Sequence, residues 1–258
     1  MSERVLEIKH LNAGYASHGL GLFRKREYVP VLKDINLNIE RNEFMGLVGE
    51  SGSGKSTLGK SVLALIPFEG SVSVAGQSYS KKNRRAFYRN VQAVFQDPLS
   101  ALDEREKIGR TLAEPLVIHG IGTAKERAVR VDEMLEMIGL DASYGRRYPK
   151  ELSGGQRQRV CIGAALMLRP KLLVADEAIS SLDVSVGSQI LNLFQEIHGR
   201  MEFSMLFISH NLTVVYYLCD RIAVMNEGRI VECGEAEKIC FSPEHPYTKK
   251  LVGLNGIN

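Results

Sequence analysis

A segment rich in glycine and serine has the composition of a site that binds phosphate. It runs Gly49, Glu50, Ser51, Gly52, Ser53, Gly54, Lys55 and Ser56. Glycines let successive backbone N–H groups turn toward one anion at the start of a helix. An apolar run precedes the segment, and a helix-forming run that begins at Thr57 follows it, which is the setting of a phosphate-binding loop. The segment, with Thr57 included, predicts binding of a nucleoside triphosphate: Lys55 would bridge the β- and γ-phosphates, and the Ser56 hydroxyl would bind Mg²⁺.

Two adjacent carboxylates follow a second apolar run. The run from Leu172 to Ala175 ends in Asp176 and Glu177. A carboxylate is a good ligand for Mg²⁺, and a second one can orient or deprotonate a water molecule. Because an apolar strand that ends in two acids is common by chance, the pair gains its meaning from the phosphate-binding loop in the same chain. We expect Asp176 to hold Mg²⁺, largely through water, and Glu177 to act on the attacking water.

A third group of small residues marks the start of a helix and carries a resemblance. Leu152 is followed by the four residues Ser153, Gly154, Gly155 and Gln156. In this order, after the loop and before the carboxylates, the pentapeptide resembles the signature of the ATP-binding cassette (ABC) family. The resemblance implies that ATP and Mg²⁺ are bound. It also implies that the signature binds the γ-phosphate of ATP held by the other subunit of a head-to-tail dimer.

Three single residues stand where the resemblance places further site residues. Gln96 is similar to the family's glutamine that touches Mg²⁺ and the attacking water and senses the transporter. His210 is similar to the switch histidine that contacts the γ-phosphate. Tyr15 stands where the family has an aromatic side chain that stacks on adenine, and Tyr28 is a rival for that role. The resemblance therefore implies that Glu177, His210 and Gln96 act in hydrolysis.

The segment after the carboxylates resembles the family's interface loop but departs from it at one position. Ser180 to Asp183 is similar to the loop that crosses the dimer interface. Ile179 stands where the family more often has a small polar residue, next to the expected catalytic carboxylate. We expect this change to slow hydrolysis without removing a catalytic group.

The elements that must position these residues are apolar strands buried on both faces. Four largely apolar runs are typical of a parallel sheet covered by helices: Phe44 to Val48, Val91 to Phe95 (with Gln92 inside it), Leu172 to Ala175 and Met205 to Ile208. Each is followed, directly or after one residue, by glycine or a polar residue of the expected site. Ligands of open α/β sheets lie beyond the carboxyl ends of the strands, so these residues are predicted to converge there.

The remaining segments complete a predicted α/β fold. Short alternating segments in the first eighty residues predict strands, and residues 97–157 predict helices, one of them opened by the capping box from Thr123 to Glu126. Residues 221–233 predict a β-hairpin. With the resemblance, we expect a RecA-like phosphate-loop NTPase core with an N-terminal antiparallel β subdomain and an inserted helical subdomain. The predicted bounds are 1–96 and 158–233 for the core, 97–157 for the helical insertion and 234–258 for a tail.

Three features resemble one branch of the family. They are Gly21 to Lys25 within the glycine-rich and basic insert from His18 to Pro30, the segment Asp183 to Val186, and the tail from Phe241 to Thr248 with Leu251. They are similar to the ATPases of oligopeptide, dipeptide and nickel importers. That branch implies a second, sister ATPase, two integral-membrane permease subunits and an extracytoplasmic substrate-binding protein. A peptide and a nickel chelate both stay open as substrates.

Composition restricts the partners. The 258 residues carry a net charge of +3, too mild to indicate nucleic acid. We find no signal core and no stretch approaching the ~18 apolar residues of a spanning helix. The four cysteines include no Cys-x-x-Cys pair, so we expect reduced, buried or idle thiols and no iron–sulfur cluster. We therefore expect the chain to stay in the cytosol, and the family resemblance implies a peripheral subunit at the cytoplasmic face of the cell membrane.

Two other functions were weighed against a transporter ATPase. Family members that act in DNA repair have a long coiled coil between loop and signature, whereas 98 residues separate Lys55 from Ser153 here. Members that act in translation carry two cassettes, and this chain has one. A phosphate-loop kinase or GTPase would leave the signature unexplained, and the guanine motif Asn-Lys-x-Asp does not occur. The sequence therefore favours the transporter ATPase.

Overall fold

The computed structural model describes residues 3–17, 27–254 and 256. The chain folds as two compact units, one made of residues 1–82 and 204–258 and the other of residues 83–203. This division does not test the domain bounds expected from the sequence, which therefore remain a prediction. Part of the insert, residues 18–26, lies outside the described residues, and its last four residues belong to a strand.

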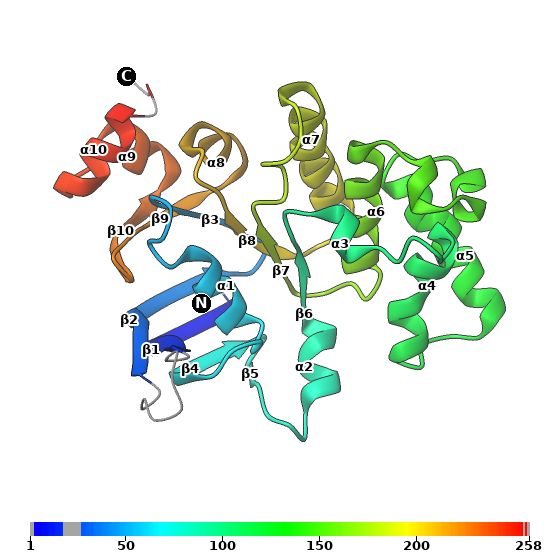
Figure 1. Ribbon diagram of the computed structural model, residues 1–258, viewed down its shortest axis with the longest axis horizontal. Coiled ribbons are helices and arrows are strands. Elements are labelled where there is room, and N and C mark those ends of the chain that lie inside the picture. Colours follow the sequence, from blue (N-terminus) through cyan, green and yellow to red (C-terminus); the bar gives the residue numbers. More distant parts are fainter. Residues whose placement is uncertain (1–2, 18–26, 255, 257–258) are drawn as a thin grey trace. The chain divides into compact units, whose positions relative to one another are not determined.

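The first unit contains an antiparallel sheet, as the sequence predicted (Figure 1). Its strand order is β2-β1-β4-β5. Alternation along β1 places Leu6 and Ile8 in the core and leaves Lys9 exposed, as expected for a sheet covered on one face. The strands are β1 (Arg4–Ser17), β2 (Glu27–Glu40), β4 (Phe68–Val74) and β5 (Gln77–Ser78).

The same unit contains the strands that lead to the glycine-rich segment, in the order β10-β9-β3-β8. Strand β3 runs parallel to both β8 and β9, and β10 pairs antiparallel with β9, which confirms the predicted hairpin. Every residue of β3 and β8 is buried, as their apolar runs predicted. The elements are β3 (Phe44–Val48), α1 (Lys55–Val62), β8 (Ser204–Ile208), α8 (Leu212–Leu218), β9 (Arg221–Asn226), β10 (Arg229–Glu235), α9 (Ala236–Phe241) and α10 (Pro246–Leu254).

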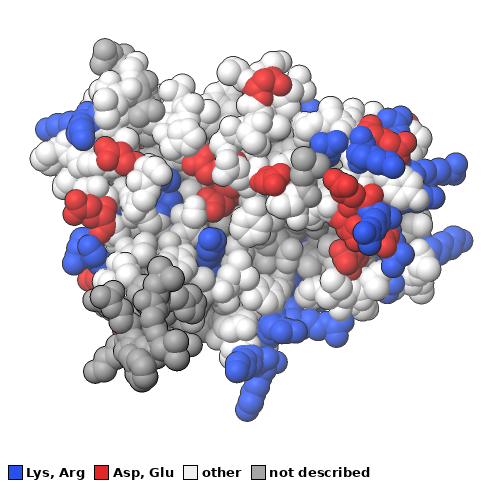
Figure 2. Space-filling model, in the orientation of Figure 1, with Lys and Arg blue, Asp and Glu red and all other residues white. Residues whose placement is uncertain are grey.

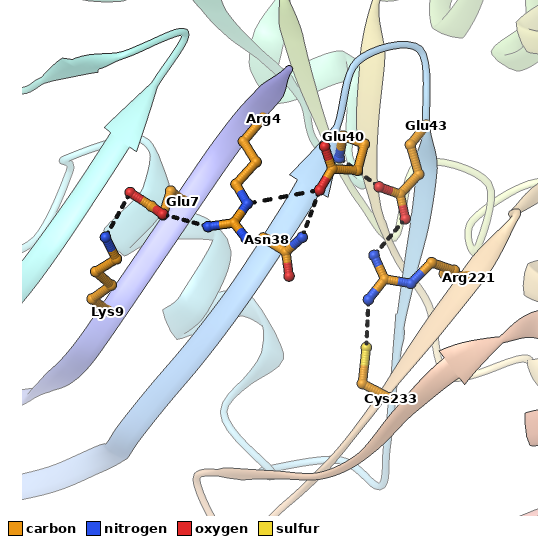
Figure 3. A network of polar contacts seen from close by, with 8 residues as sticks. All are labelled: Arg4, Glu7, Lys9, Asn38, Glu40, Glu43, Arg221 and Cys233. Atoms are coloured by element: carbon orange, nitrogen blue, oxygen red, sulfur yellow. Dashed lines mark hydrogen bonds and ion pairs between the residues drawn. The ribbon is translucent and has the colours of Figure 1, made fainter. Parts of the chain in front are cut away.

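A network of charged groups holds the beginning of β3 (Figure 3). The Glu43 side chain is only 8% exposed, and its carboxylate lies 3.0 Å from the Arg221 guanidinium at the start of β9. The next N–H, that of Phe44, donates to the Asp220 carboxylate at 2.8 Å. A buried carboxylate requires such a partner. These contacts therefore fix β3 against β9 at the end opposite the glycine-rich segment.

The second unit holds two parallel strands and a group of helices. Strands β6 (Val91–Val94) and β7 (Leu172–Asp176) pair in parallel. Leu112, Leu116 and Leu135 are fully buried among the helices, and the predicted capping box at Thr123 is present. The helices are α2 (Arg84–Asn90), α3 (Pro98–Ala101), α4 (Ile108–Ile118), α5 (Ala124–Met137), η1 (Ala142–Arg146), η2 (Pro149–Glu151), α6 (Gly154–Leu166) and α7 (Val184–Arg200). The predicted α/β fold class, with its antiparallel sheet and its helical segment, is confirmed.

Candidate functional site

The glycine-rich segment forms the turn between β3 and α1 in the first unit. Gly49 and Gly54 have φ angles of 154° and 110°, in the region that side chains rarely adopt. A Cβ on Gly49 would lie 2.1 Å from the Met225 carbonyl oxygen on β9. The neighbouring strand therefore leaves room only for glycine, and the backbone is drawn tightly around the first turn of α1.

Lys55 is held inside this turn rather than in solvent. Its side chain is 7% exposed, and its Nζ donates to the carbonyl oxygens of Gly49 at 2.8 Å and Glu50 at 3.0 Å. The hydroxyl of Ser53 is buried and has no hydrogen-bond partner among the described residues. A buried hydroxyl without a partner costs about 1–3 kcal/mol, and a phosphate oxygen would satisfy it. The turn therefore fits a bound triphosphate.

Tyr15 lies next to the same turn. Its hydroxyl is 3.3 Å from the Thr57 hydroxyl on α1, while 42% of the residue is exposed. The rival, Tyr28, lies on the paired strand β2 opposite Ala16 and is also exposed. The structure thus brings Tyr15 to the phosphate-binding turn with part of its surface free to meet a flat ligand.

His210 also belongs to the first unit and follows β8. The preceding N–H, that of Ser209, donates to the Leu47 carbonyl near the end of β3 at 3.2 Å. Asn211 caps α8 by accepting from the Val214 N–H at 3.2 Å. His210 is exposed between these two anchors. His210 therefore follows the carboxyl end of β8, the strand next to β3, and β3 leads into the glycine-rich turn.

The acidic pair lies in the second unit, at the end of β7. Asp176 is the last residue of that strand, and both carboxylates are half-buried. Glu177 has a φ of 52°, a left-handed backbone that costs a residue with a side chain about 1–2 kcal/mol. The Ser180 N–H and hydroxyl hold its carbonyl oxygen, at 3.1 and 2.9 Å. Strain of this kind persists only where neighbours enforce it, and it clusters at functional sites.

Gln96 is joined to the segment after the acidic pair. It follows β6, which pairs with β7 so that Val94 lies opposite Ala175. Its backbone carbonyl accepts the Ser181 hydroxyl at 3.0 Å. Asp176 therefore ends β7, and Gln96 follows the adjacent parallel strand β6 after one residue. The sequence suggests an interface loop for Ser181 but carries no signal for this bond.

The signature residues begin the long helix α6. Ser153 and Gln156 form a capping box in which the serine hydroxyl accepts from the Gln156 N–H at 3.3 Å. The Gln156 amide also donates to the Tyr144 hydroxyl at 3.1 Å. A Cβ on Gly155 would lie 2.5 Å from a Val186 methyl group on α7. Gly155 thus has a packing reason in addition to the nucleotide contact that the sequence suggested.

A groove lies on the helices of the second unit. Its volume is about 700 Å³, and α4, α5 and η1 line it. Figure 2 shows acidic and basic side chains mixed over α4 and α5. Much of the lining is small or apolar, including Gly109, Ala113, Val117, Ala128, Val131 and Gly145.

The cysteines take no part in these arrangements. All four are free thiols. Burial, with a smaller contribution from Asp97, raises the pKa of Cys161 to about 12, and burial raises that of Cys240 to about 11. Across the described part of the chain, no three His, Cys, Asp or Glu side chains gather as a metal-binding group. In the same part, no helix has the length and apolarity needed to cross a bilayer.

The fold and the glycine-rich turn define a phosphate-loop ATPase, and comparison with known proteins gives its family. The ABC transporter family model matches residues 32–180. The di/tripeptide transport ATP-binding protein DppF of Pseudomonas aeruginosa is 44% identical over 255 residues, covering 97% of this chain and 78% of its own length. The oligopeptide transport ATP-binding protein OppF of Bacillus subtilis is 42% identical over 258 residues, covering 98% and 82%. The chain therefore belongs to the ABC transporter family and is an ATPase of that family.

Solved structures agree with this assignment. The cbiO1 protein of Clostridium perfringens, part of the ABC transporter complex cbiONQ, superposes with a TM-score of 0.81 at 27% identity, covering 92% of this chain and 90% of that one. A dimeric ATP-binding cassette in a post-hydrolysis state, bound to ADP and Pi, gives a TM-score of 0.76 at 26% identity, covering 90% and 98%.

Proposed function

We propose that this ATPase powers the import of peptides through a membrane transporter. The observation that carries the proposal is the turn around Lys55, whose ammonium is buried on loop carbonyls beside the unsatisfied Ser53 hydroxyl. The relatives are named for di/tripeptide and oligopeptide transport, which favours a peptide over a nickel chelate as the substrate.

In this function the glycine-rich turn binds the triphosphate. Backbone N–H groups of residues 52–56 and the Lys55 ammonium bind phosphate oxygens, and Tyr15 stacks on the adenine. Ser56 would supply a hydroxyl oxygen, and Asp176 and Gln96 would supply carboxylate and amide oxygens, the hard ligands that Mg²⁺ prefers. When bound, Mg²⁺ neutralises charge on the β- and γ-phosphates.

Hydrolysis then depends on two polar side chains. Glu177 orients the attacking water and accepts its proton, and its enforced left-handed backbone supports this role because such strain is retained at functional sites. His210 donates to the γ-phosphate. Gln96 would touch the same water through its amide.

The signature acts on a second chain. Ser153, Gly154, Gly155 and Gln156 lie at the N-terminus of the 13-residue helix α6, where backbone N–H groups attract an anion. We place them on the γ-phosphate held by a sister ATPase in a head-to-tail dimer. The dimeric state of one structural relative supports this arrangement.

The transporter would supply the remaining partners. Two integral-membrane permease subunits would hold the chain peripherally at the cytoplasmic face of the membrane, and an extracytoplasmic binding protein would deliver the peptide. The groove between α4, α5 and η1 supports a docking site for a permease helix, because small lining residues such as Gly109 and Ala113 allow close approach.

Gln96→Ala should reduce peptide-stimulated hydrolysis in the assembled transporter more than basal hydrolysis. Equal losses would leave Gln96 as a metal ligand only.

Two substitutions test the ATPase site. Lys55→Ala should lower hydrolysis more than tenfold, because the triphosphate loses its fixed cation. Glu177→Gln should keep ATP binding and nearly stop turnover, because an amide cannot accept the proton. Lys60→Ala, an exposed lysine on the same helix α1, is the matched control and should leave both properties unchanged. Hydrolysis by Lys55→Ala within tenfold of wild type would reject the site.

A further inference from the structure

The C-terminal helix reaches the phosphate-binding turn through one side chain. The hydroxyl of Tyr247, on α10, accepts a hydrogen bond from the backbone N–H of Glu50 at 3.0 Å, across 197 residues of sequence. The tail served in the sequence analysis only as a mark of one branch of the family. This contact places the tail next to the phosphate-binding turn.

The tail that carries Tyr247 is firmly attached to the first unit. The Glu232 carboxylate on β10 accepts the N–H groups of Glu244 at 2.8 Å and His245 at 3.0 Å. The N–H of Tyr247 donates to the His245 Nδ1 at 3.2 Å. Thr248, Leu251 and Val252 bury one face of α10. The tyrosine hydroxyl is therefore a fixed point rather than the tip of a loose arm.

The same peptide group that meets Tyr247 also meets the catalytic lysine. The N–H of the Gly49–Glu50 peptide donates to the tyrosine, and its C=O accepts from the Lys55 Nζ at 2.8 Å. A peptide group is planar, so a rotation that moves the N–H also moves the carbonyl. Gly49, with φ at 154° and no Cβ, places little steric restraint on that rotation. The tyrosine supplies the restraint.

We propose that Tyr247 is a positioning residue for ATP binding: it fixes the Gly49–Glu50 peptide, whose carbonyl in turn holds the Lys55 ammonium in place for the phosphates. The proposal rests on the proposed ATPase site. A second contact from the same helix, between Lys250 and the Glu50 carboxylate at 3.5 Å, joins two exposed side chains. It contributes little, because solvent screens such pairs.

The experiment measures binding of ATP without Mg²⁺ to the full-length chain by equilibrium dialysis. Tyr247→Phe removes only the hydroxyl and should weaken binding about three- to tenfold, the effect of one hydrogen bond. Lys250→Ala and the matched control Tyr216→Phe, an exposed tyrosine on α8, should each change the Kd less than twofold. An unchanged Kd for Tyr247→Phe would overturn the proposal.

A double-substitution cycle separates positioning from general support of the fold. Because Tyr247 acts through Lys55, Tyr247→Phe should have less than a twofold effect on the Kd in a Lys55→Ala background. An equal weakening in both backgrounds would overturn the proposal and leave Tyr247 a structural residue. Equal ATP binding by wild type and Lys55→Ala would instead reject the ATPase site itself, so the two failures are distinct.

Discussion

The left-handed backbone of Glu177 allows catalysis and conformational strain to be tested separately at one position. Glu177→Ala and Glu177→Gly both remove the carboxylate, so every contact of the side chain is lost equally in the two variants. They differ only in how well each tolerates a φ of 52°. Both should lose turnover, because neither can accept a proton from water.

The difference in stability follows from the backbone. The left-handed conformation costs alanine about 1–2 kcal/mol. Glycine adopts it freely but loses about 0.5–1 kcal/mol more in backbone entropy on folding. Glu177→Gly should therefore be more stable than Glu177→Ala by about 0.5–1 kcal/mol. For a chain of this size that corresponds to a melting temperature about 1–4 °C higher.

Thermal unfolding without nucleotide, together with ATP turnover, provides the assay. Arg169 is the matched position, exposed and with the same φ of 52°. Arg169→Gly should likewise melt above Arg169→Ala, and both should keep full activity. If Glu177→Ala melts at or above Glu177→Gly, the strained backbone is rejected. Turnover near the wild-type rate in either variant would reject Glu177 as the proton acceptor.

Three further predictions concern stability and reactivity. Arg221→Ala leaves the Glu43 carboxylate, which is only 8% exposed, without its cation. Urea unfolding should show a free energy of unfolding lower by about 2–3 kcal/mol, whereas Arg4→Ala, at an exposed ion pair, should lower it by less than about 0.5 kcal/mol. Burial, with the nearby Asp220 charge, raises the pKa of Cys219 well above its ordinary value, and burial also raises the pKa of Cys233 although the Arg221 guanidinium opposes it. Because Cys219 is buried and Cys233 is exposed, alkylation at pH 8 should modify Cys233 at least tenfold faster. Burial disfavours ionisation of Glu232, but hydrogen bonds from tail N–H groups outweigh it and hold its pKa below the ordinary 4.5. The ionised Glu232 therefore stabilises the fold above about pH 4.5, and this stabilisation is lost as the pH falls below that value. Wild type should lose more free energy of unfolding than Glu232→Gln between pH 6 and pH 3.

Local composition was sufficient to predict the elements and much of the site. The apolar runs that form β3 and β8 are buried along their whole length. An uninterrupted apolar run of this length suits a parallel strand covered on both faces better than most other arrangements. The capping box at Thr123 works within one helical turn, so its residues are visible side by side in the sequence. The glycine-rich turn is likewise encoded by consecutive residues.

Contacts between distant segments could not be predicted from the sequence. The bond from Ser181 to the Gln96 carbonyl and the bond from Glu50 to Tyr247 join a side chain to a backbone group. Every residue has a backbone carbonyl, and every residue except proline has a backbone N–H, so a bond to the backbone does not require a particular residue type at that position. Neither pairing can therefore be recognised in the sequence. The left-handed conformation of Glu177 is also invisible, because glutamate is not a residue that indicates a positive φ.

We propose that a second chain completes this ATPase site, and the dependence of hydrolysis on protein concentration distinguishes a dimeric site from a monomeric one. The isolated chain should be mostly monomeric and a poor ATPase if, as proposed, its phosphate-binding turn and its signature bind different nucleotides. Its specific activity should rise with concentration and increase strongly when a sister ATPase and the membrane subunits are added. Full activity that does not depend on concentration, in a chain that remains monomeric, would contradict the account.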